Sequence, residues 1–260
     1  MTSNPIVIKD KPSAEWQVNI LTTGGPFKAS SLLATNDIEV AVFDTGLPQH
    51  SGSLIRSLES FGITPDAVTL VFNTHSHVDH SHNNLLFKNA RIFCSLRDRQ
   101  WTTAFHETLA GSEDPISADV QSFYPEMPTS KFDPKIVSKV FSIEKKVWDP
   151  RRWGVTDQFC WIEEVELPKG IKILPTPGHV PHHVSFIIET SGQPVLLCGD
   201  ALLTQDEENS AISLIPPFNK ADYKHSQNVI KAFSGMIVPG HDVPFYNQLQ
   251  VESKSPKSVN

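Results

Sequence analysis

The feature that most constrains this chain is the sequence THSHVDH at 74–80, which directly follows an apolar stretch. Four of its side chains can bind metal, although the whole chain of 260 residues contains only 11 histidines. Alternate residues of an extended segment point to the same side, so His75 and His77 can bind one ion. Asp79 and His80 come where a helix is expected to begin, and that turn directs them toward a neighbouring position. A histidine-rich polar loop is the less favoured interpretation. The run therefore predicts a metal site.

Three further ligand candidates, His179, Asp200 and His241, each follow an expected strand. Loops at the carboxyl ends of strands commonly carry the functional groups of layered α/β folds. All candidates together comprise five histidines and two aspartates, enough for two divalent ions that share one carboxylate. Such a pair of ions leaves room for a water or hydroxide between them, the nucleophile of metal-assisted hydrolysis.

The order of expected elements indicates an α/β fold, because strands alternate with helices. Apolar and alternating patterns predict strands over 17–22, 31–34, 39–43, 68–72, 91–94, 160–167, 171–174, 184–189, 195–198 and 236–238. Helical patterns cover 52–61, 80–87, 101–109 and 221–233. The length suits a single domain over 1–250, followed by a polar tail at 251–260.

The segment 97–158 differs from its surroundings, since prolines punctuate a stretch that is rich in apolar and aromatic residues. We expect an insertion that packs on the main domain, with Tyr124 and Trp153 near the metal site. Whether it acts as a lid or as a dimer surface stays open, and a homodimer is one candidate assembly.

Composition restricts the location and the partners of the chain. No apolar stretch approaches 18 residues, and the N-terminus lacks an apolar signal core, so we expect neither a membrane span nor secretion. Cys94, Cys160 and Cys198 lie among apolar residues and are expected to be buried thiols in a reducing compartment. We expect the cytoplasm, with the nucleus as a second location. The net charge of −7 gives no overall attraction for nucleic acid.

Five motifs, taken in order, resemble those of the metallo-β-lactamase superfamily. They are DTG at 44–46, the run at 74–80, TPGH at 176–179, GD at 199–200 and PGH at 239–241. The likeness covers 17–97 and 160–247. It implies a four-layer αββα sandwich with zinc at two sites.

The resemblance also implies a role for each candidate ligand. One zinc ion would be held by His75, His77 and His179, and the other by Asp79, His80 and His241, with Asp200 between them. Asp44 would orient the ligand loop, in line with the general need to fix metal ligands. Asp79 would in addition hold the nucleophile or accept its proton.

Two substrate classes remain open within this superfamily. The branch that the chain most resembles implies an endoribonuclease that cleaves RNA phosphodiester bonds, of the kind that processes histone pre-mRNA. The alternative is a thioesterase like glyoxalase II, or another hydrolase of small esters. RNA binding requires cations near the metals, and Arg151 and Arg152, beside Lys145 and Lys146, are the candidates. His183 is a further candidate for substrate contact, against the interpretation that it is structural.

Overall fold

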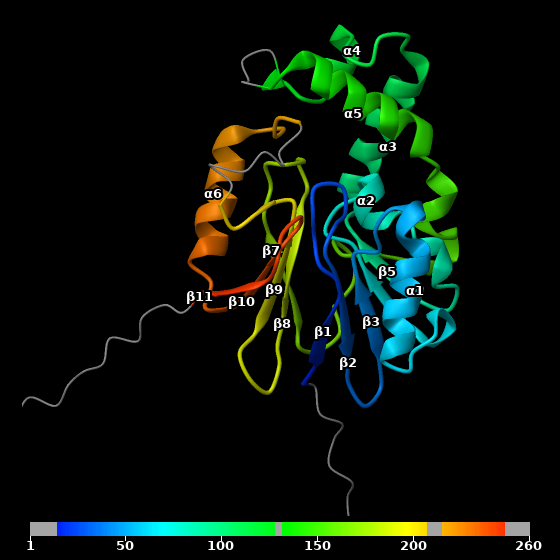
Figure 1. Ribbon diagram of the computed structural model, residues 1–260, viewed down its shortest axis with the longest axis vertical. Coiled ribbons are helices and arrows are strands. Elements are labelled where there is room, and N and C mark those ends of the chain that lie inside the picture. Colours follow the sequence, from blue (N-terminus) through cyan, green and yellow to red (C-terminus); the bar gives the residue numbers. More distant parts are fainter. Residues whose placement is uncertain (1–14, 128–131, 207–214, 248–260) are drawn as a thin grey trace, which may run out of the picture.

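A computed structural model describes residues 15–127, 132–206 and 215–247 and confirms the sandwich of two sheets (Figure 1). The expected tail at 251–260 lies outside the described residues. The first sheet follows the order β1 (Gln17–Thr22), β2 (Ser31–Thr35), β3 (Val40–Phe43), β4 (Leu70–Phe72), β5 (Arg91–Cys94) and β6 (Phe159–Trp161). The second follows the order β11 (Phe245–Asn247), β10 (Gly235–Pro239), β9 (Val195–Gly199), β8 (Val184–Ile188) and β7 (Ile171–Pro175).

Helices complete the outer layers. The amphipathic helix α1 (Ser51–Ser60) buries Leu54 and Leu58 against the first sheet. On the second sheet, α6 (Lys220–Lys231) packs Ile230 against residues of β9 and β10. Figure 1 shows these two helices on opposite sides of the molecule. Among the described helices, none combines the length and the apolar character that crossing a bilayer requires.

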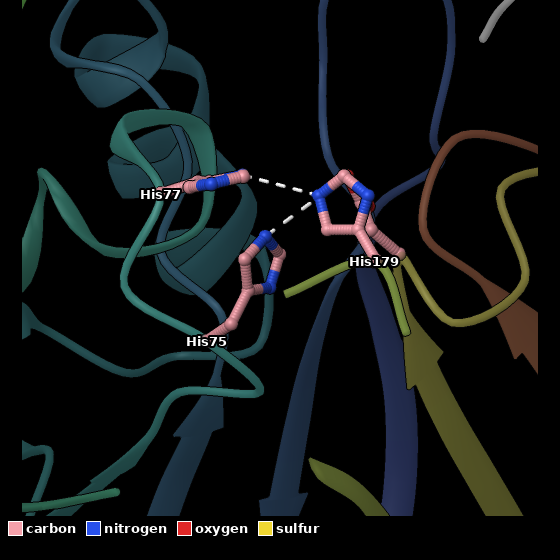
Figure 2. Close-up of side chains that lie close together, drawn as sticks. His75, His77 and His179 are labelled. Carbon is pink, nitrogen blue, oxygen red and sulfur yellow. Dashed lines mark hydrogen bonds and ion pairs between the residues drawn. The ribbon is translucent and has the colours of Figure 1, made fainter. Parts of the chain in front are cut away.

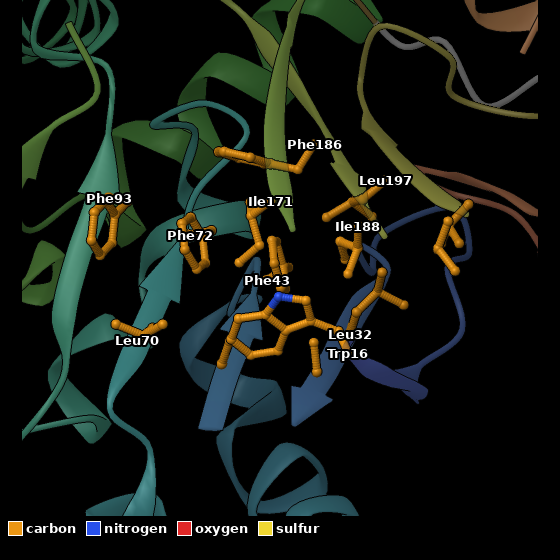
Figure 3. Close-up of a cluster of buried hydrophobic side chains, with 14 of the residues drawn as sticks. Trp16, Leu32, Phe43, Leu70, Phe72, Phe93, Ile171, Phe186, Ile188 and Leu197 are labelled. Atoms are coloured by element: carbon orange, nitrogen blue, oxygen red, sulfur yellow. The ribbon is translucent and has the colours of Figure 1, made fainter. Parts of the chain in front are cut away.

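The core is built by side chains that point alternately to the two faces of each strand. In β3, Phe43 points between the sheets while Val42 points toward α1. The register pairs Phe43 with Phe72 and Phe72 with Phe93. Their rings stack with centroids 4.6 Å and 4.8 Å apart, and Phe186 of the facing sheet meets them edge-on (Figure 3). This aromatic layer fixes the strand ends from which the ligand loops begin.

The segment after β5 forms a helical layer of its own above the loop end of the sandwich (Figure 1). It contains α3 (Leu96–Gly111), α4 (Ala118–Gln121) and α5 (Pro134–Val147). Asp133 caps α5 by accepting a hydrogen bond from the Lys135 N–H, and Pro134 occupies the first turn. A separate buried cluster holds these helices together, made of Phe105, Leu109, Val120, Tyr124, Val137 and Phe141.

Two expected elements were wrong in detail. The strand expected over 160–167 is limited to β6, which pairs with β5 in the first sheet, and the chain then crosses to β7 in the second. The helix expected over 80–87 is instead one short turn, α2 (Val78–Ser81), followed by a 3-10 turn (Asn84–Leu86). The short α2 leaves Asp79 and His80 at the same edge of the sandwich as the rest of the ligand run.

Candidate metal centre

The seven ligand candidates meet at one end of the sandwich, each on a loop or short turn after a strand. The run at 74–80 follows β4 of the first sheet, whereas His179, Asp200 and His241 follow β7, β9 and β10 of the second sheet. Two groups result, in each of which the potential ligand atoms lie within 4.8 Å of one another. The first is His75, His77, His179 and Asp200, and the second is Asp79, His80 and His241.

The first group is a compact set of imidazoles, with His77 and His179 directed toward each other (Figure 2). Nε2 of His179 lies 3.1 Å from Nδ1 of His77 and 3.3 Å from Oδ2 of Asp200. Nε2 of His75 lies 4.0 Å from the same carboxylate oxygen. Zinc–ligand bonds of 2.0–2.1 Å in a tetrahedron place ligand atoms about 3.3 Å apart. These spacings therefore fit a single zinc ion.

The second group lies on the other side of Asp200. Oδ1 of Asp200 is 3.0 Å from Nε2 of His80 and 3.3 Å from Nε2 of His241. The Oδ2 atom of Asp79 lies 3.4 Å from Nε2 of His241 and 3.8 Å from Nε2 of His80. Because its two oxygens face different groups, Asp200 occupies the position of a bridging carboxylate.

Unpartnered atoms support the same assignment. Nε2 of His75, Nε2 of His80 and Oδ1 of Asp200 are buried and lack a hydrogen bond of normal geometry within the described residues, although the last two atoms face each other at 3.0 Å as an ion pair. Leaving a buried polar atom without a partner costs about 1–3 kcal/mol. Three such atoms pointing into one small space fit a metal pair, and the residues present therefore suit two divalent ions.

Asp44 orients the ligand run, as the sequence predicted, although its role in metal binding stays a prediction. Its Oδ1 accepts from the Thr74 N–H, and its Oδ2 accepts from the Thr74 hydroxyl and from Nδ1 of His80, each within 2.8–2.9 Å. With Nδ1 as the donor, Nε2 of His80 keeps its lone pair for an ion. Asp44 also has a positive φ of 49°, unusual for a residue other than glycine. Backbone strain of this kind concentrates at functional sites.

His241 and His75 are oriented in the same way. Nδ1 of His241 donates to the carbonyl oxygen of Gly25 at 2.9 Å, and Nδ1 of His75 lies 3.1 Å from the Thr74 hydroxyl. In each ring the other nitrogen, Nε2, faces the site. Gly240 is required beside them, because a Cβ atom there would overlap Oδ1 of Asp200.

The structure places the His183 side chain inside the protein. Its side chain is buried, its Nε2 accepts from the Asp200 N–H at 3.1 Å, and its Nδ1 lies 3.0 Å from the Thr176 hydroxyl. Both ring nitrogens are thus engaged inside the protein, and a contact between His183 and a substrate stays a prediction. It fixes the backbone of the bridging aspartate, which is the structural interpretation of the sequence.

Three residues of the 97–158 segment contact the ligand run. The Tyr124 hydroxyl lies 3.3 Å from Nε2 of His77, and the Trp153 indole N–H donates to the Ser76 carbonyl oxygen at 3.2 Å. The expected approach of Tyr124 and Trp153 to the metal site is therefore confirmed. Asp98 was missed by the sequence analysis. Its Oδ2 accepts from the Ser76 N–H at 2.7 Å. The only signal for it was an acidic residue in the first turn of a helix after the serine cap Ser95.

Burial keeps the histidines of the first group neutral. It lowers the pKa of His77 to about 3, and the neighbouring His179 adds to that shift. Burial also lowers the pKa of His75 well below its usual value, followed by the effect of His80. Neutral imidazole is the form that binds metal, so these histidines are ready to act as ligands.

Opposite charges pair between the second group and Asp200. Burial favours neutral Asp200, but His80 and His241 outweigh it and hold the pKa of that carboxyl well below its usual range. Burial likewise opposes a charged His241, yet Asp200 and Asp79 raise the pKa of this histidine to about 10. Carboxylates that stabilise an imidazolium at this point will also stabilise a metal cation.

A cavity opens at the ligands and has two unlike walls. We call the first the metal wall, which consists of His77, Asp79, His179, Asp200 and His241. The second, the apolar wall, consists of Pro26, Phe27, Leu47, Val78, Val140, Ile143, Val147, Leu203 and Ile215. Gln49 and Glu144 complete the lining, and no lysine or arginine occurs among the described residues that line it.

Arg151 and Arg152 lie in a neighbouring groove with Lys146, Trp148 and Gln49, not in this cavity. Arg151 is exposed, and its guanidinium binds both oxygens of Asp149, at 2.8 Å from Nη2 and 2.9 Å from Nε. The two grooves share Gln49 and Val147 in their linings. The predicted cations thus adjoin the site without facing the ligands.

The two sheets carry paired clusters of metal-binding side chains at one end, an arrangement suited to metal-assisted chemistry. Residues 24–241 match the family model of the metallo-beta-lactamase superfamily, and the chain belongs to that superfamily.

Individual relatives are distant. The chain is 26% identical over 206 residues to metallo-beta-lactamase domain-containing protein 1 of Mus musculus, which covers 78% of this chain and 59% of that protein. It is 24% identical over 195 residues to an N-acyl homoserine lactonase of Bacillus thuringiensis, and that match covers 73% of this chain and 62% of the lactonase. Thus the chain spans about three fifths of the length of these curated relatives.

Among solved structures, a dizinc quorum-quenching lactonase in complex with the product N-hexanoyl-L-homoserine superimposes with a TM-score of 0.60. The identity is 15%, over 86% of this chain and 76% of that one. At this distance the likeness shows the fold alone.

Proposed function

We propose that the protein is a dinuclear, zinc-dependent hydrolase of small carboxylic esters, such as lactones or thioesters, that carry an apolar arm. One observation carries this proposal. The cavity that contains the metal wall is otherwise almost entirely apolar, and the described lining holds no cation. A phosphodiester backbone needs cations for its affinity, whereas an acyl chain gains about 25 cal/mol for each Å² of apolar surface that it buries.

In this proposal His75, His77 and His179 hold one ion, and Asp79, His80 and His241 hold the other, with Asp200 between them. When bound, divalent zinc supplies a Lewis acid for the carbonyl group and lowers the pKa of water. Asp79 lies toward the cavity, since 23% of its side chain is exposed against 6% for Asp200. Its pKa is held low by His80 and His241, against the effect of burial, so it is an ionised carboxylate at neutral pH, with its oxygens toward the cavity.

The reaction follows from this placement. Water oxygen adds to the ester carbon, and its proton passes to a carboxylate oxygen of Asp79. The bond from that carbon to the leaving oxygen or sulfur then breaks. Asp79 returns the proton to the leaving group, so that one ester and one water yield an acid and an alcohol or thiol. The apolar wall holds the arm and excludes bulk water.

RNA cleavage is the second candidate, favoured by one observation: Lys146, Arg151 and Arg152 line a groove that adjoins the cavity. The sequence motifs resemble the branch of the superfamily for which RNA cleavage is implied, and the likeness to metallo-beta-lactamase domain-containing protein 1 agrees with that resemblance.

Side-by-side assays of the zinc-loaded protein separate the candidates. The substrates are N-hexanoyl-L-homoserine lactone, S-lactoylglutathione and a single-stranded RNA, each with and without a chelator. We expect zinc-dependent turnover of at least one of the two esters and none of the RNA. Zinc-dependent RNA cleavage without ester turnover at any salt concentration would reverse the assignment.

A further inference from the structure

Glu144 is a buried carboxyl group in the substrate cavity that the proposed chemistry does not use. It lies in α5, between the apolar-wall residues Val140 and Val147, and only 9% of the residue is exposed. Its Oε2 atom is buried and forms no hydrogen bond with the described part of the chain. Glutamate is rarely buried without a partner, so this side chain calls for an explanation.

An internal ion pair does not explain why Glu144 is buried. No ion pair joins Glu144 to a lysine, arginine or histidine within 15–127, 132–206 and 215–247. The charged group that acts on Glu144 is the carboxylate of Asp79, which also lines the cavity. The charge of Glu144 in turn raises the pKa of Tyr124 in the insertion. Its partner is therefore to be sought in the cavity itself.

Its protonation state decides what Glu144 can bind. Burial, followed by the nearby charge of Asp79, raises the pKa of Glu144 to about 8. At neutral pH the group is then mainly the uncharged acid, which can donate a hydrogen bond. A cation would require the carboxylate form, which the apolar wall disfavours.

We propose that Glu144 is a specificity residue, whose carboxyl group donates a hydrogen bond to a carbonyl oxygen carried within the apolar arm of the substrate. This inference rests on the proposed ester hydrolysis and narrows its substrate class to esters with an amide or keto group in that arm. A purely hydrocarbon arm would leave Glu144 buried without a partner, at a cost in binding. The preference for an arm with a carbonyl group would come more from the cost of leaving Glu144 unpartnered than from the hydrogen bond itself.

The test measures binding of a probe that the protein cannot hydrolyse as an ester. Calorimetric titration of the zinc-loaded protein with N-butylhexanamide at pH 6.5 compares the native chain with Glu144→Gln and Glu144→Met. Glutamine keeps a neutral donor, so its Kd should stay within about twofold of native. Methionine has a similar length but no donor, and we expect binding weakened about tenfold. Glu113→Gln, at an exposed glutamate outside the cavity, is the matched control and should change nothing.

The pH dependence gives an independent readout. Native binding should be full below pH 7 and weaken as the pH rises through about 8, because the donor proton is lost. Glu144→Gln should show no such loss. Comparison of the native protein with Glu144→Gln therefore tests the hydrogen bond from Glu144 even if the methionine variant fails to fold.

Three outcomes would overturn the inference: equal binding by the methionine and native proteins, a pH profile shared by native and Gln proteins, or tighter native binding of hexylammonium than of the amide. None depends on turnover. A protein that binds the amide through Glu144 but hydrolyses no ester would refute the proposed function and leave this contact standing.

Discussion

The metal wall and the apolar wall of the cavity are built in different ways. Each residue of the metal wall comes from a loop or short turn after a strand, and internal hydrogen bonds hold the histidines, as with His80 on Asp44 and His241 on Gly25. The apolar wall draws its side chains from several loops and from one helix, α5, whose Val140, Ile143 and Val147 offer only dispersion contacts. Substitutions in α5 can therefore change substrate fit without moving the ligands, so chemistry and selectivity are separable in this molecule.

Tyr124 couples α5 of the apolar wall to the metal wall. Tyr124 belongs to the buried cluster that supports α5, and its hydroxyl reaches His77 of the metal wall. The predictions below test how far the separation holds, starting from the change that should remove the chemistry.

His179→Ala should abolish hydrolysis, with a loss of more than about 100-fold, because one ion loses a ligand that no neighbour can replace. Zinc content measured by mass spectrometry should fall from about two ions toward one. His225→Ala, at an exposed histidine of α6, is the control and should keep both ions. Full activity in the first variant would contradict the metal assignment.

Asp44→Asn should weaken zinc affinity about 10- to 100-fold, because it replaces the carboxylate that orients His80 with a neutral amide. Competition with a chromogenic chelator measures this change. Asp37→Asn, in an exposed turn, is the matched control. An unchanged affinity would show that backbone contacts alone hold His80 in place.

Tyr124→Phe should weaken zinc affinity by roughly two- to tenfold, the effect of one neutral hydrogen bond. The ring stays in the buried cluster, so the thermal unfolding of the metal-free protein should barely change. Phe105→Leu, in the same cluster but without a contact to a ligand, should show the converse: lower stability and the same affinity. Equal affinities in Tyr124→Phe and the native protein would mean that the walls are independent.

Arg151→Ala combined with Arg152→Ala should have the smallest effect, a change of less than about twofold in kcat/KM for a small ester. Both side chains lie outside the cavity, and exposed ion pairs such as Arg151 with Asp149 contribute little. If RNA is the substrate instead, the same variant should bind it more weakly and with a flatter salt dependence.

The sequence predicted the metal wall well because residue type and position within a strand-end loop decide it. The expectation that Cys198 is a buried thiol is confirmed, and one backbone angle explains how it lies. Alternation along β9 places Cys198 on the same side as Asp200, but Gly199 has a φ of 51° and turns the chain. Cys198 therefore faces the core under α6, whereas Asp200 faces the metals. A Cβ at Gly199 would also overlap the Thr74 hydroxyl, so the turn needs glycine.

The apolar wall escaped prediction for a different reason. Its position depends on contacts between distant residues, such as Tyr124 with His77, and no local pattern encodes them. The prolines of 97–158 also obscured α5, although Pro134 marks its first turn. Glu144 interrupts the apolar face of that helix, which is why a pattern based on hydrophobic spacing did not single it out.

The distribution of the ligands between the two sheets has a mechanical consequence. A metal pair at this place would link the first sheet, through the run after β4, to the second sheet, through His179, Asp200 and His241. It would act as a cross-link that closes a long stretch of chain, from His75 to His241, and so restrict the unfolded ensemble. The hairpin end of the sandwich lacks these ligands and is held by apolar packing together with Trp16, whose indole N–H donates to the carbonyl oxygen of Lys169 at 3.0 Å. Chelation should therefore loosen the molecule from one end, with amide exchange rising first around the ligand loops.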